Sequence, residues 1–250
     1  MKIAVLLDGR RSRDGGGAGF VAATLRGLGH AVRVESVATE PRPVLDRLAG
    51  QPVDLVVSLV RPGGARPRLA FELAGALDLM RIPYTGVGPQ GLLVGGDLAR
   101  ARQVARLAGV PVADARGGKG RALSVLVLGN RQPEVFPACE CVGRGARRTW
   151  RRAGLSPDDA AHVAAMARRI HGELDLGGYH RIDLCLPPGL PPGGAPCFVA
   201  ADVRPMLDPA LARALYAPLD PAALLRRILS LGLRRPRPPE WAVAEDGERA

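Results

Sequence analysis

Lysine is almost absent from this chain, although the chain is strongly basic. Lysine occurs only at positions 2 and 119, while Lys and Arg together number 35 and the formal net charge at pH 7 is +11. The arginines are scattered along the whole sequence, among many Ala, Gly and Pro residues. This distribution indicates an arginine-biased composition rather than one basic patch, and so argues against a nucleic-acid-binding protein. That class stays open as an alternative that rests on charge alone.

The sequence also lacks a hydrophobic run long enough to cross a membrane. The first apolar run covers only residues 3–7 before Asp8 interrupts it, which argues against a signal peptide. With 250 residues, 47% of them hydrophobic, the chain has ample length for a core in one large or two modest domains. We therefore expect a soluble, globular, cytoplasmic protein without membrane partners.

Cysteine is scarce, and the four cysteines do not form a common metal motif. They fall at positions 139, 141, 185 and 197, as a Cys-x-Cys pair and two separate residues. A structural zinc site needs four converging ligands, and a Cys-x-x-Cys partner motif is missing. We expect reduced thiols in the core, with metal binding as the alternative. The four histidines likewise show no metal or triad spacing: His30, His162, His171 and His180.

The first half of the sequence alternates apolar strands with amphipathic helices. Strands are expected within 1–11, between Gly29 and Val37, and at 54–60, separated by helices that begin near Gly17 and after Pro67. A further helix begins at Asp97, a favourable N-cap residue, and ends before Gly109. Strands that alternate with helices pair in parallel, so this half predicts an open α/β sheet.

The second half predicts an antiparallel sheet with few helices. A strand at 122–130 is expected to pair with the segment 133–143, and a helix follows with Ser156 as its N-cap. The basic run "RGARRTWRR" (144–152) is interpreted as an exposed loop, with phosphate or nucleic-acid contact as the alternative. The last helix is expected at 220–233, before a disordered tail.

The segment "GGYHRIDLCLPPGLPPGGAPCFVAADVRP" (177–205) predicts a hairpin that carries half of a metal site. Its first strand has Arg181 and Asp183, and its second strand passes Ala200 and Ala201 before it reaches Asp202. Two carboxylates on facing strands can share one divalent cation. Here an alanine stands where the second carboxylate is expected.

Several of these segments resemble the D-alanine–D-alanine ligases, which have the ATP-grasp fold. The similar segments are "KIAVLLDG", residues 77–112, "LSVLVLGN", "LDLGGYHRIDL" with "FVAADVRPM", and "LLRRILSLGL". The likeness extends to about residue 233. It implies an N-terminal, Rossmann-like open parallel sheet, a reduced ATP-grasp α+β domain at the C-terminus, and a homodimer formed through the N-terminal domain.

The resemblance also implies a domain organisation from which the central nucleotide lid is missing. We expect an N-terminal domain at 1–96, a hinge helix and shortened linker at 97–122, a C-terminal domain at 123–233 and a tail at 234–250. The linker replaces a whole domain of the family. Ten residues reach at most about 35 Å when extended, and they cannot form a three-stranded lid.

Only part of the family's site is matched. Asp183 and Asp202 fall on metal-ligand positions and Arg181 on the arginine that stabilises the acyl phosphate, whereas the bridging acid falls on Ala200 and a phosphate-contacting lysine on Leu98. Lys119, flanked by glycines, is the remaining candidate for phosphate contact, with a plain linker as the alternative.

The resemblance therefore implies a non-catalytic ligase-like protein with a vestigial Arg181 and an incomplete metal site. Such a pseudoenzyme would bind or regulate an unknown protein partner linked to cell-wall (peptidoglycan) precursor metabolism, and would need no cofactor. The alternative is an active minimal ligase that uses ATP and Mg²⁺ and is completed by another chain.

Overall fold

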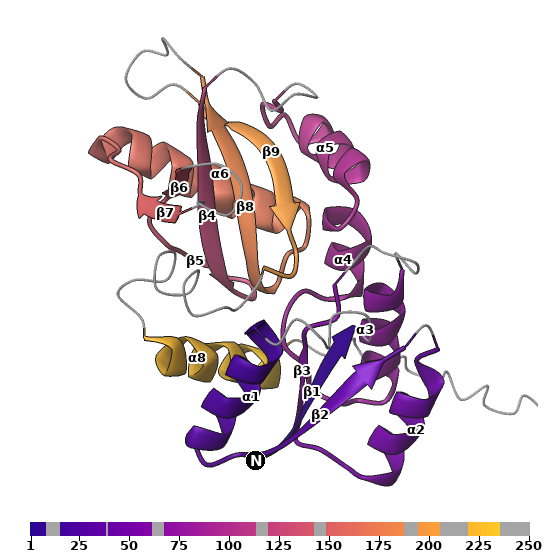
Figure 1. The fold of residues 1–250 in the computed structure, drawn as a ribbon. Coiled ribbons are helices and arrows are strands. Elements are labelled where there is room, and N and C mark those ends of the chain that lie inside the picture. The colour runs from indigo at the N-terminus through magenta and orange to yellow at the C-terminus, as the bar shows by residue number, and fades with distance from the viewer. Residues whose placement is uncertain are drawn as a thin grey trace, which may run out of the picture.

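The described residues form two β-sheets, one parallel and one antiparallel (Figure 1). The computed structural model describes residues 1–8, 16–38, 40–61, 68–113, 120–142, 149–187, 195–205 and 220–235. The parallel sheet has three strands in the order β2-β1-β3, and the second sheet has the path β7-β6-β4-β8-β9, with β5 paired to β4. This arrangement confirms the predicted mixed α/β fold.

The parallel sheet is built from the first third of the chain. Both neighbours of β1 run parallel to it, as the alternation of strands and helices predicts. The helix α2 was not predicted, and it begins just after Pro41. The elements are β1 (Lys2–Asp8), α1 (Gly16–Gly27), β2 (Ala31–Val37), α2 (Arg42–Gly50), β3 (Leu55–Ser58) and α3 (Leu69–Leu79).

Two helices lead from the parallel sheet to the antiparallel one, α4 (Pro89–Gly95) and α5 (Leu98–Leu107). The Asp97 carboxylate accepts hydrogen bonds from the backbone N–H groups of Ala99 (3.0 Å) and Arg100 (3.1 Å), so the predicted N-cap is confirmed. After α5 the chain passes along the edge of the antiparallel sheet, where Val112 forms a parallel bridge with Phe198.

The antiparallel sheet is covered on one face by α6 (Pro157–Glu173) (Figure 1). Ser156 accepts a 3.1 Å hydrogen bond from the Asp159 N–H, which confirms the predicted cap of this helix. Residues 149–152 form a strand paired with β6, so the predicted loop is wrong there. The strands are β4 (Arg121–Gly129), β5 (Glu134–Val135), β6 (Cys139–Val142), β7 (Thr149–Arg152), β8 (Gly178–Leu186) and β9 (Cys197–Asp202).

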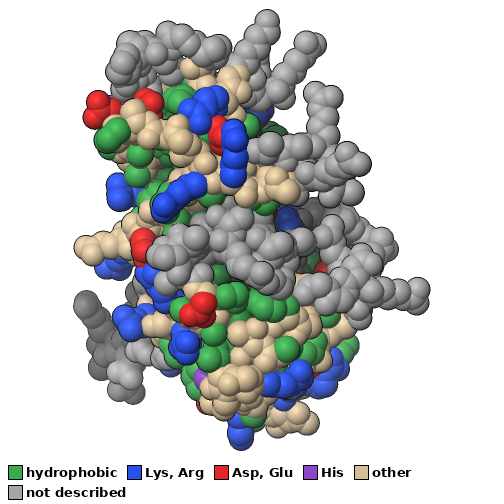
Figure 2. Space-filling view, turned by 60° about the vertical axis from the view of Figure 1, so that its left-hand side comes forward, with side chains coloured by type: hydrophobic (Ala, Val, Ile, Leu, Met, Phe, Trp, Pro, Cys, Tyr) green, Lys and Arg blue, Asp and Glu red, His purple; other side chains and the backbone are tan. Residues whose placement is uncertain are grey.

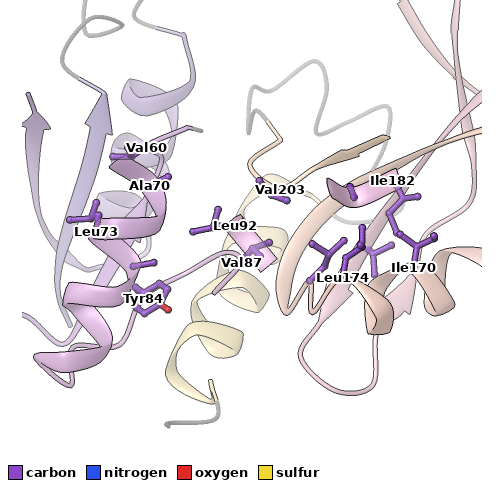
Figure 3. Packing of buried hydrophobic residues seen from close by; sticks show 14 of the residues in the cluster. Val60, Ala70, Leu73, Tyr84, Val87, Leu92, Ile170, Leu174, Ile182 and Val203 are labelled. Carbon is purple, nitrogen blue, oxygen red and sulfur yellow. The ribbon is translucent and has the colours of Figure 1, made fainter. Parts of the chain in front are cut away.

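One hydrophobic cluster runs through both halves of the molecule. Figure 3 shows it from Leu73 and Tyr84, past Leu92 and Val203, to Ile182 on strand β8 of the antiparallel sheet. A second cluster joins β1 and α1 to β4, β8 and the last helix, α8 (Pro221–Leu233). The two sheets are therefore packed together through shared apolar side chains. The division of the chain at residues 96, 122 and 233 stays a prediction.

Two arginines from the second half of the chain donate hydrogen bonds to the backbone of residues 85–87 in the first half. Arg204 is buried, and its guanidinium donates hydrogen bonds to the carbonyl oxygens of Thr85 (3.2 Å) and Val87 (3.5 Å). Arg235 donates to the intervening Gly86 carbonyl, and its guanidinium carbon lies 4.3 Å from the centre of the Tyr84 ring. Three successive carbonyl groups are thus bound by two side chains, which fixes the position of one sheet relative to the other.

Among the helices of the described segments, none has both the length and the apolar character that a membrane crossing needs. Of the predicted tail, only residues 234 and 235 belong to the segments that the structure describes.

Candidate functional site

The hairpin of β8 and β9 places the predicted site residues on one face of the antiparallel sheet. In the strand register, Arg181 lies opposite Asp202 and Asp183 lies opposite Ala200. Directly opposed residues in an antiparallel pair have side chains on the same face. Ala200 therefore faces Asp183 directly, as the sequence predicts.

A β-bulge sets this register. Asp183 pairs with Ala200 while the next residue, Leu184, pairs with Phe198, which leaves Val199 as the extra residue of β9. Because side chains alternate along a strand, a β9 without the bulge would present Asp202 on the opposite face. The Val199 carbonyl accepts a 3.0 Å hydrogen bond from the Arg102 Nε on α5, so the hinge helix holds the bulge.

Arg181 binds both acids of the hairpin. Its Nε donates to the Asp183 Oδ1 at 3.0 Å and its Nη2 donates to the Asp183 Oδ2 at 3.2 Å. The same Nη2 lies 3.6 Å from the Asp202 Oδ2. The bidentate geometry matches the planar guanidinium to a carboxylate, the strongest form of this ion pair. One guanidinium thus contacts both carboxylates of the hairpin.

Neighbouring strands contribute two further contacts to this cluster. The Ser124 hydroxyl on β4 donates a 2.6 Å hydrogen bond to the Asp183 Oδ1, although the residues on either side of Ser124 in this strand are apolar. The Arg181 guanidinium carbon lies 5.7 Å from the centre of the Trp150 ring on β7, within the range of a cation–π contact. Trp150 therefore contacts the candidate site, which the loop interpretation did not foresee.

Asp202 is also bound from the N-terminal half of the chain. The Arg61 Nη2, in the segment after β3, lies 3.4 Å from both carboxylate oxygens of Asp202. The backbone N–H of Arg204 donates a 3.1 Å hydrogen bond to the Asp202 Oδ1. Both carboxylates of the hairpin consequently have charge-assisted hydrogen bonds that the protein itself supplies.

These residues do not fit the magnesium site of the resembled family. Mg²⁺ requires near-octahedral oxygen coordination, and a methyl group at position 200 offers no ligand atom. The two carboxylates that are present already bind guanidinium groups, and a cation between them would meet the positive charge of Arg181. Within the segments that the structure describes, no group of three or more His, Cys, Asp or Glu side chains is placed to hold a metal ion.

The other sequence candidates lie apart from the hairpin cluster or outside the described residues. Lys119 belongs to the segment 114–119, which the structure does not describe. Leu98, at the family's lysine position, is half exposed at the start of α5. Cys139 and Cys141 lie on β6, with Arg152 and Trp150 opposite them on β7. Burial raises the pKa of the Cys139 thiol, which favours an inert, protonated sulfur over a metal ligand.

The opposite face of the same sheet carries a buried histidine pair. The rings of His171 on α6 and His180 on β8 stack with their centres 5.1 Å apart. Desolvation, and then the nearby His171, hold the pKa of His180 well below its usual value. The His171 Nε2 donates to the Asn130 carbonyl at 2.6 Å, and desolvation lowers the pKa of this ring as well. Neither ring nitrogen of His180 has a hydrogen-bond partner among the described residues.

Sequence reasoning missed three contributors to the site, namely Ser124, Trp150 and Arg61. A lone serine inside the strand "LSVLVLGN" is a usable signal, because a buried hydroxyl needs a hydrogen-bond partner. For Arg61 no local pattern exists, since its partner Asp202 is separated from it by 141 positions.

Solved structures with a similar fold identify the fold of this chain. No family model matches the sequence, and no curated protein matches it. The D-alanine–D-alanine ligase of Bacillus anthracis complexed with ATP is a similar solved structure, with a TM-score of 0.73 and 14% identity over 94% of this chain and 98% of that chain. The VanG D-Ala:D-Ser ligase of Enterococcus faecalis is similar with a TM-score of 0.67 and 13% identity, over 92% of this chain and 98% of that one. The chain therefore has the fold of these ATP-grasp ligases.

Proposed function

We propose that this chain is a non-catalytic protein on a D-alanine–D-alanine ligase scaffold. It acts as a binding or regulatory protein linked to cell-wall precursor metabolism. The single observation that carries the proposal is that the Arg181 guanidinium lies between Asp183 and Asp202, with Ala200 where the bridging carboxylate is expected. The link to cell-wall precursors rests on the fold alone, whose solved relatives are D-alanine–D-alanine and D-Ala:D-Ser ligases.

The chemistry of the hairpin supports the absence of turnover. Phosphoryl transfer depends on cations that neutralise charge on the phosphate oxygens and on groups that position them. Here the two hairpin acids bind arginine side chains of the protein instead of a metal ion. The carboxylates that would recruit magnesium, and through it ATP, are already charge-compensated, so ATP is not needed as a cofactor.

The surface argues against nucleic acid as the partner. On the face shown in Figure 2, basic side chains are interspersed with acidic and hydrophobic ones. Several arginines form ion pairs with carboxylates of the strands. Arg33 and Arg47 pair with Glu35, and Arg121 and Arg151 pair with Glu140. A phosphate-binding stripe would instead present its arginines unpaired along one surface. The predicted homodimer and the cytoplasmic location belong to this proposal.

The proposal is tested by an activity assay on the purified chain with D-alanine, ATP and Mg²⁺. Phosphate release and dipeptide formation are both measured, beside an active ligase as positive control. We expect neither product above the level of a protein-free blank. Turnover that the variant Asp183→Asn abolishes would contradict the proposal and would favour an active minimal ligase. Phosphate release that persists unchanged in Asp183→Asn would come from a contaminating ATPase and would leave the hairpin non-catalytic.

A further inference from the structure

Two cysteines face each other across the same hairpin. Cys185 on β8 and Cys197 on β9 are direct partners in the strand register, at the end of the hairpin pairing beyond the bulge. Both are thiols in the structure. Because directly opposed residues present their side chains on the same face, the two sulfur atoms belong to one face of the sheet. This pairing is independent of the Arg181 cluster and does not rest on the proposed function.

The backbone at this pair is within a small movement of disulfide geometry. The Phe198 N–H and carbonyl bond outward, to Pro111 (2.7 Å) and Ala113 (2.9 Å), so the corresponding groups of the preceding Cys197 point toward β8. Cys185 and Cys197 therefore form a hydrogen-bonded pair, for which the Cα atoms are about 5.5 Å apart. Disulfides span Cα separations of about 4.4–6.8 Å but need their Cβ atoms about 3.5–4.5 Å apart, whereas opposed residues have Cβ atoms about 4.5–5.5 Å apart, so the two strand ends must approach by about 1 Å for the bond to form.

The two thiols differ in their access to solvent. Cys185 is 3% exposed, whereas Cys197 is partly exposed. The Cys185 sulfur lies close to Gly120, only 2.9 Å from where a Cβ at that position would be. A bond to Cys197 therefore requires the Cys185 sulfur to turn away from Gly120 into another staggered rotamer. Cys197 is consequently the thiol that an external reagent reaches first.

We propose that Cys185 and Cys197 form a reversible disulfide that joins β8 to β9. The oxidant is a low-molecular-weight disulfide such as oxidised glutathione. The Cys197 thiolate attacks one of its sulfurs and releases one thiolate, which leaves a mixed disulfide on Cys197. The Cys185 thiol then loses its proton and attacks the Cys197 sulfur, so that the second small thiolate departs. Two protein thiols are oxidised and one small disulfide is reduced to two thiols.

The other two cysteines, Cys139 and Cys141, do not face a cysteine on the neighbouring strand β7. Cys141 is also partly exposed, but Trp150 lies opposite it, and Cys139 has Arg152 opposite on β7. Cys141 thus provides a matched control, because it can form a mixed disulfide but has no cysteine as cross-strand partner. The Cys185–Cys197 bond would fasten the outer strand β9, which carries Asp202, to β8, which carries Arg181 and Asp183.

The full chain is equilibrated in buffers of graded reduced and oxidised glutathione, and the reaction is quenched with an alkylating reagent. Residues 182–203 contain no Lys or Arg, so one tryptic peptide carries both cysteines. We expect this peptide to lose a pair of hydrogens and to resist alkylation in oxidising buffer. The melting temperature should rise by about 5 °C, because the bond constrains the unfolded chain. A reductant such as dithiothreitol should reverse both changes.

Three variants keep the proposal falsifiable. Cys197→Ala and Cys185→Ala should abolish the rise in melting temperature, and Cys141→Ala should leave it intact. Mixed disulfides with glutathione as the only product on wild-type protein would overturn the proposal. So would a linked peptide that joins Cys185 or Cys197 to Cys139 or Cys141, or a rise in melting temperature that Cys197→Ala retains.

Discussion

Arg181 lies opposite Asp202 across the β8–β9 hairpin and binds Asp183 on its own strand with two hydrogen bonds of 3.0 and 3.2 Å. A guanidinium is charged at every physiological pH, and this one is covalently part of the chain. The hairpin therefore has a permanent cation between its two acids. A hairpin that held magnesium would instead exchange its cation with solvent and with nucleotide.

The first prediction concerns the stability that Asp183 contributes. Its carboxylate accepts hydrogen bonds from Arg181 and Ser124, and both members of the ion pair are less than a third exposed. Asp183→Ala leaves a half-buried guanidinium and a hydroxyl without this partner, and should lower the free energy of unfolding by about 1–3 kcal/mol. Urea denaturation measures the loss.

The matched control for Asp183 is Asp46, whose ion pair with Arg42 is exposed on α2. Asp46→Ala should change the free energy of unfolding by less than about 0.5 kcal/mol, because exposed pairs contribute little. Equal losses for the two variants would contradict a structural role for Asp183 within the hairpin cluster.

The second prediction separates backbone strain from a steric clash at the junction of the two sheets. Gly29 and Gly86 both have positive φ, of 81° and 91°. A Cβ at Gly29 would meet nothing within 4 Å, whereas a Cβ at Gly86 would lie 1.6 Å from the Arg204 Nη1. Gly29→Ala should cost about 1 kcal/mol of folding free energy from strain alone. Gly86→Ala should cost about 1–3 kcal/mol more, because Arg204 must leave its carbonyl partners. Equal melting temperatures for the two variants would show that the hydrogen bonds of Arg204 to Thr85 and Val87 do not stabilise the fold.

The third prediction concerns acid stability. Desolvation lowers the pKa of His180 well below its unfolded value of about 6.5. Between these two pKa values the ring is protonated in the unfolded chain and neutral in the folded chain. The stability contributed by the neutral ring is fully present above about pH 6.5 and is lost as the pH falls toward the folded-state pKa. His171, whose pKa is also lowered by desolvation, adds in the same direction.

Chemical denaturation between pH 7 and 5 measures this dependence. The wild-type free energy of unfolding should fall with a slope approaching about 1.4 kcal/mol per pH unit for each histidine concerned. His180→Leu should flatten the slope. A slope that His180→Leu does not alter would show that other groups cause the acid sensitivity.

The elements that local chemistry determines were predictable from the sequence. Asp97 and Ser156 cap α5 and α6 as expected, because a cap depends on residues within one turn. The placement of Ala200 opposite Asp183 was also predictable, since one hairpin sets both positions. In each case the chemistry that decides the structure lies within one short segment.

The contacts that join distant segments were not predictable. Arg61 reaches Asp202 from the other half of the chain, and Arg204 is buried against Thr85 and Val87, although arginines of this chain are usually exposed. In an arginine-rich sequence nothing local distinguishes a buried arginine from a solvated one. Strand β7 was missed for a related reason, because its Thr149–Arg152 segment is polar and takes its structure from pairing with β6.

The central claim is that the cation of this hairpin is Arg181, and a calorimetric titration tests it most directly. Wild-type protein and Asp183→Ala are each titrated with ATP, in the presence and in the absence of millimolar Mg²⁺. The account predicts no magnesium-dependent binding of ATP by wild type, and the same result for the variant, because the carboxylates already bind guanidinium groups. Magnesium-dependent ATP binding by wild type that Asp183→Ala abolishes would contradict the account and would establish a metal–nucleotide site on the hairpin.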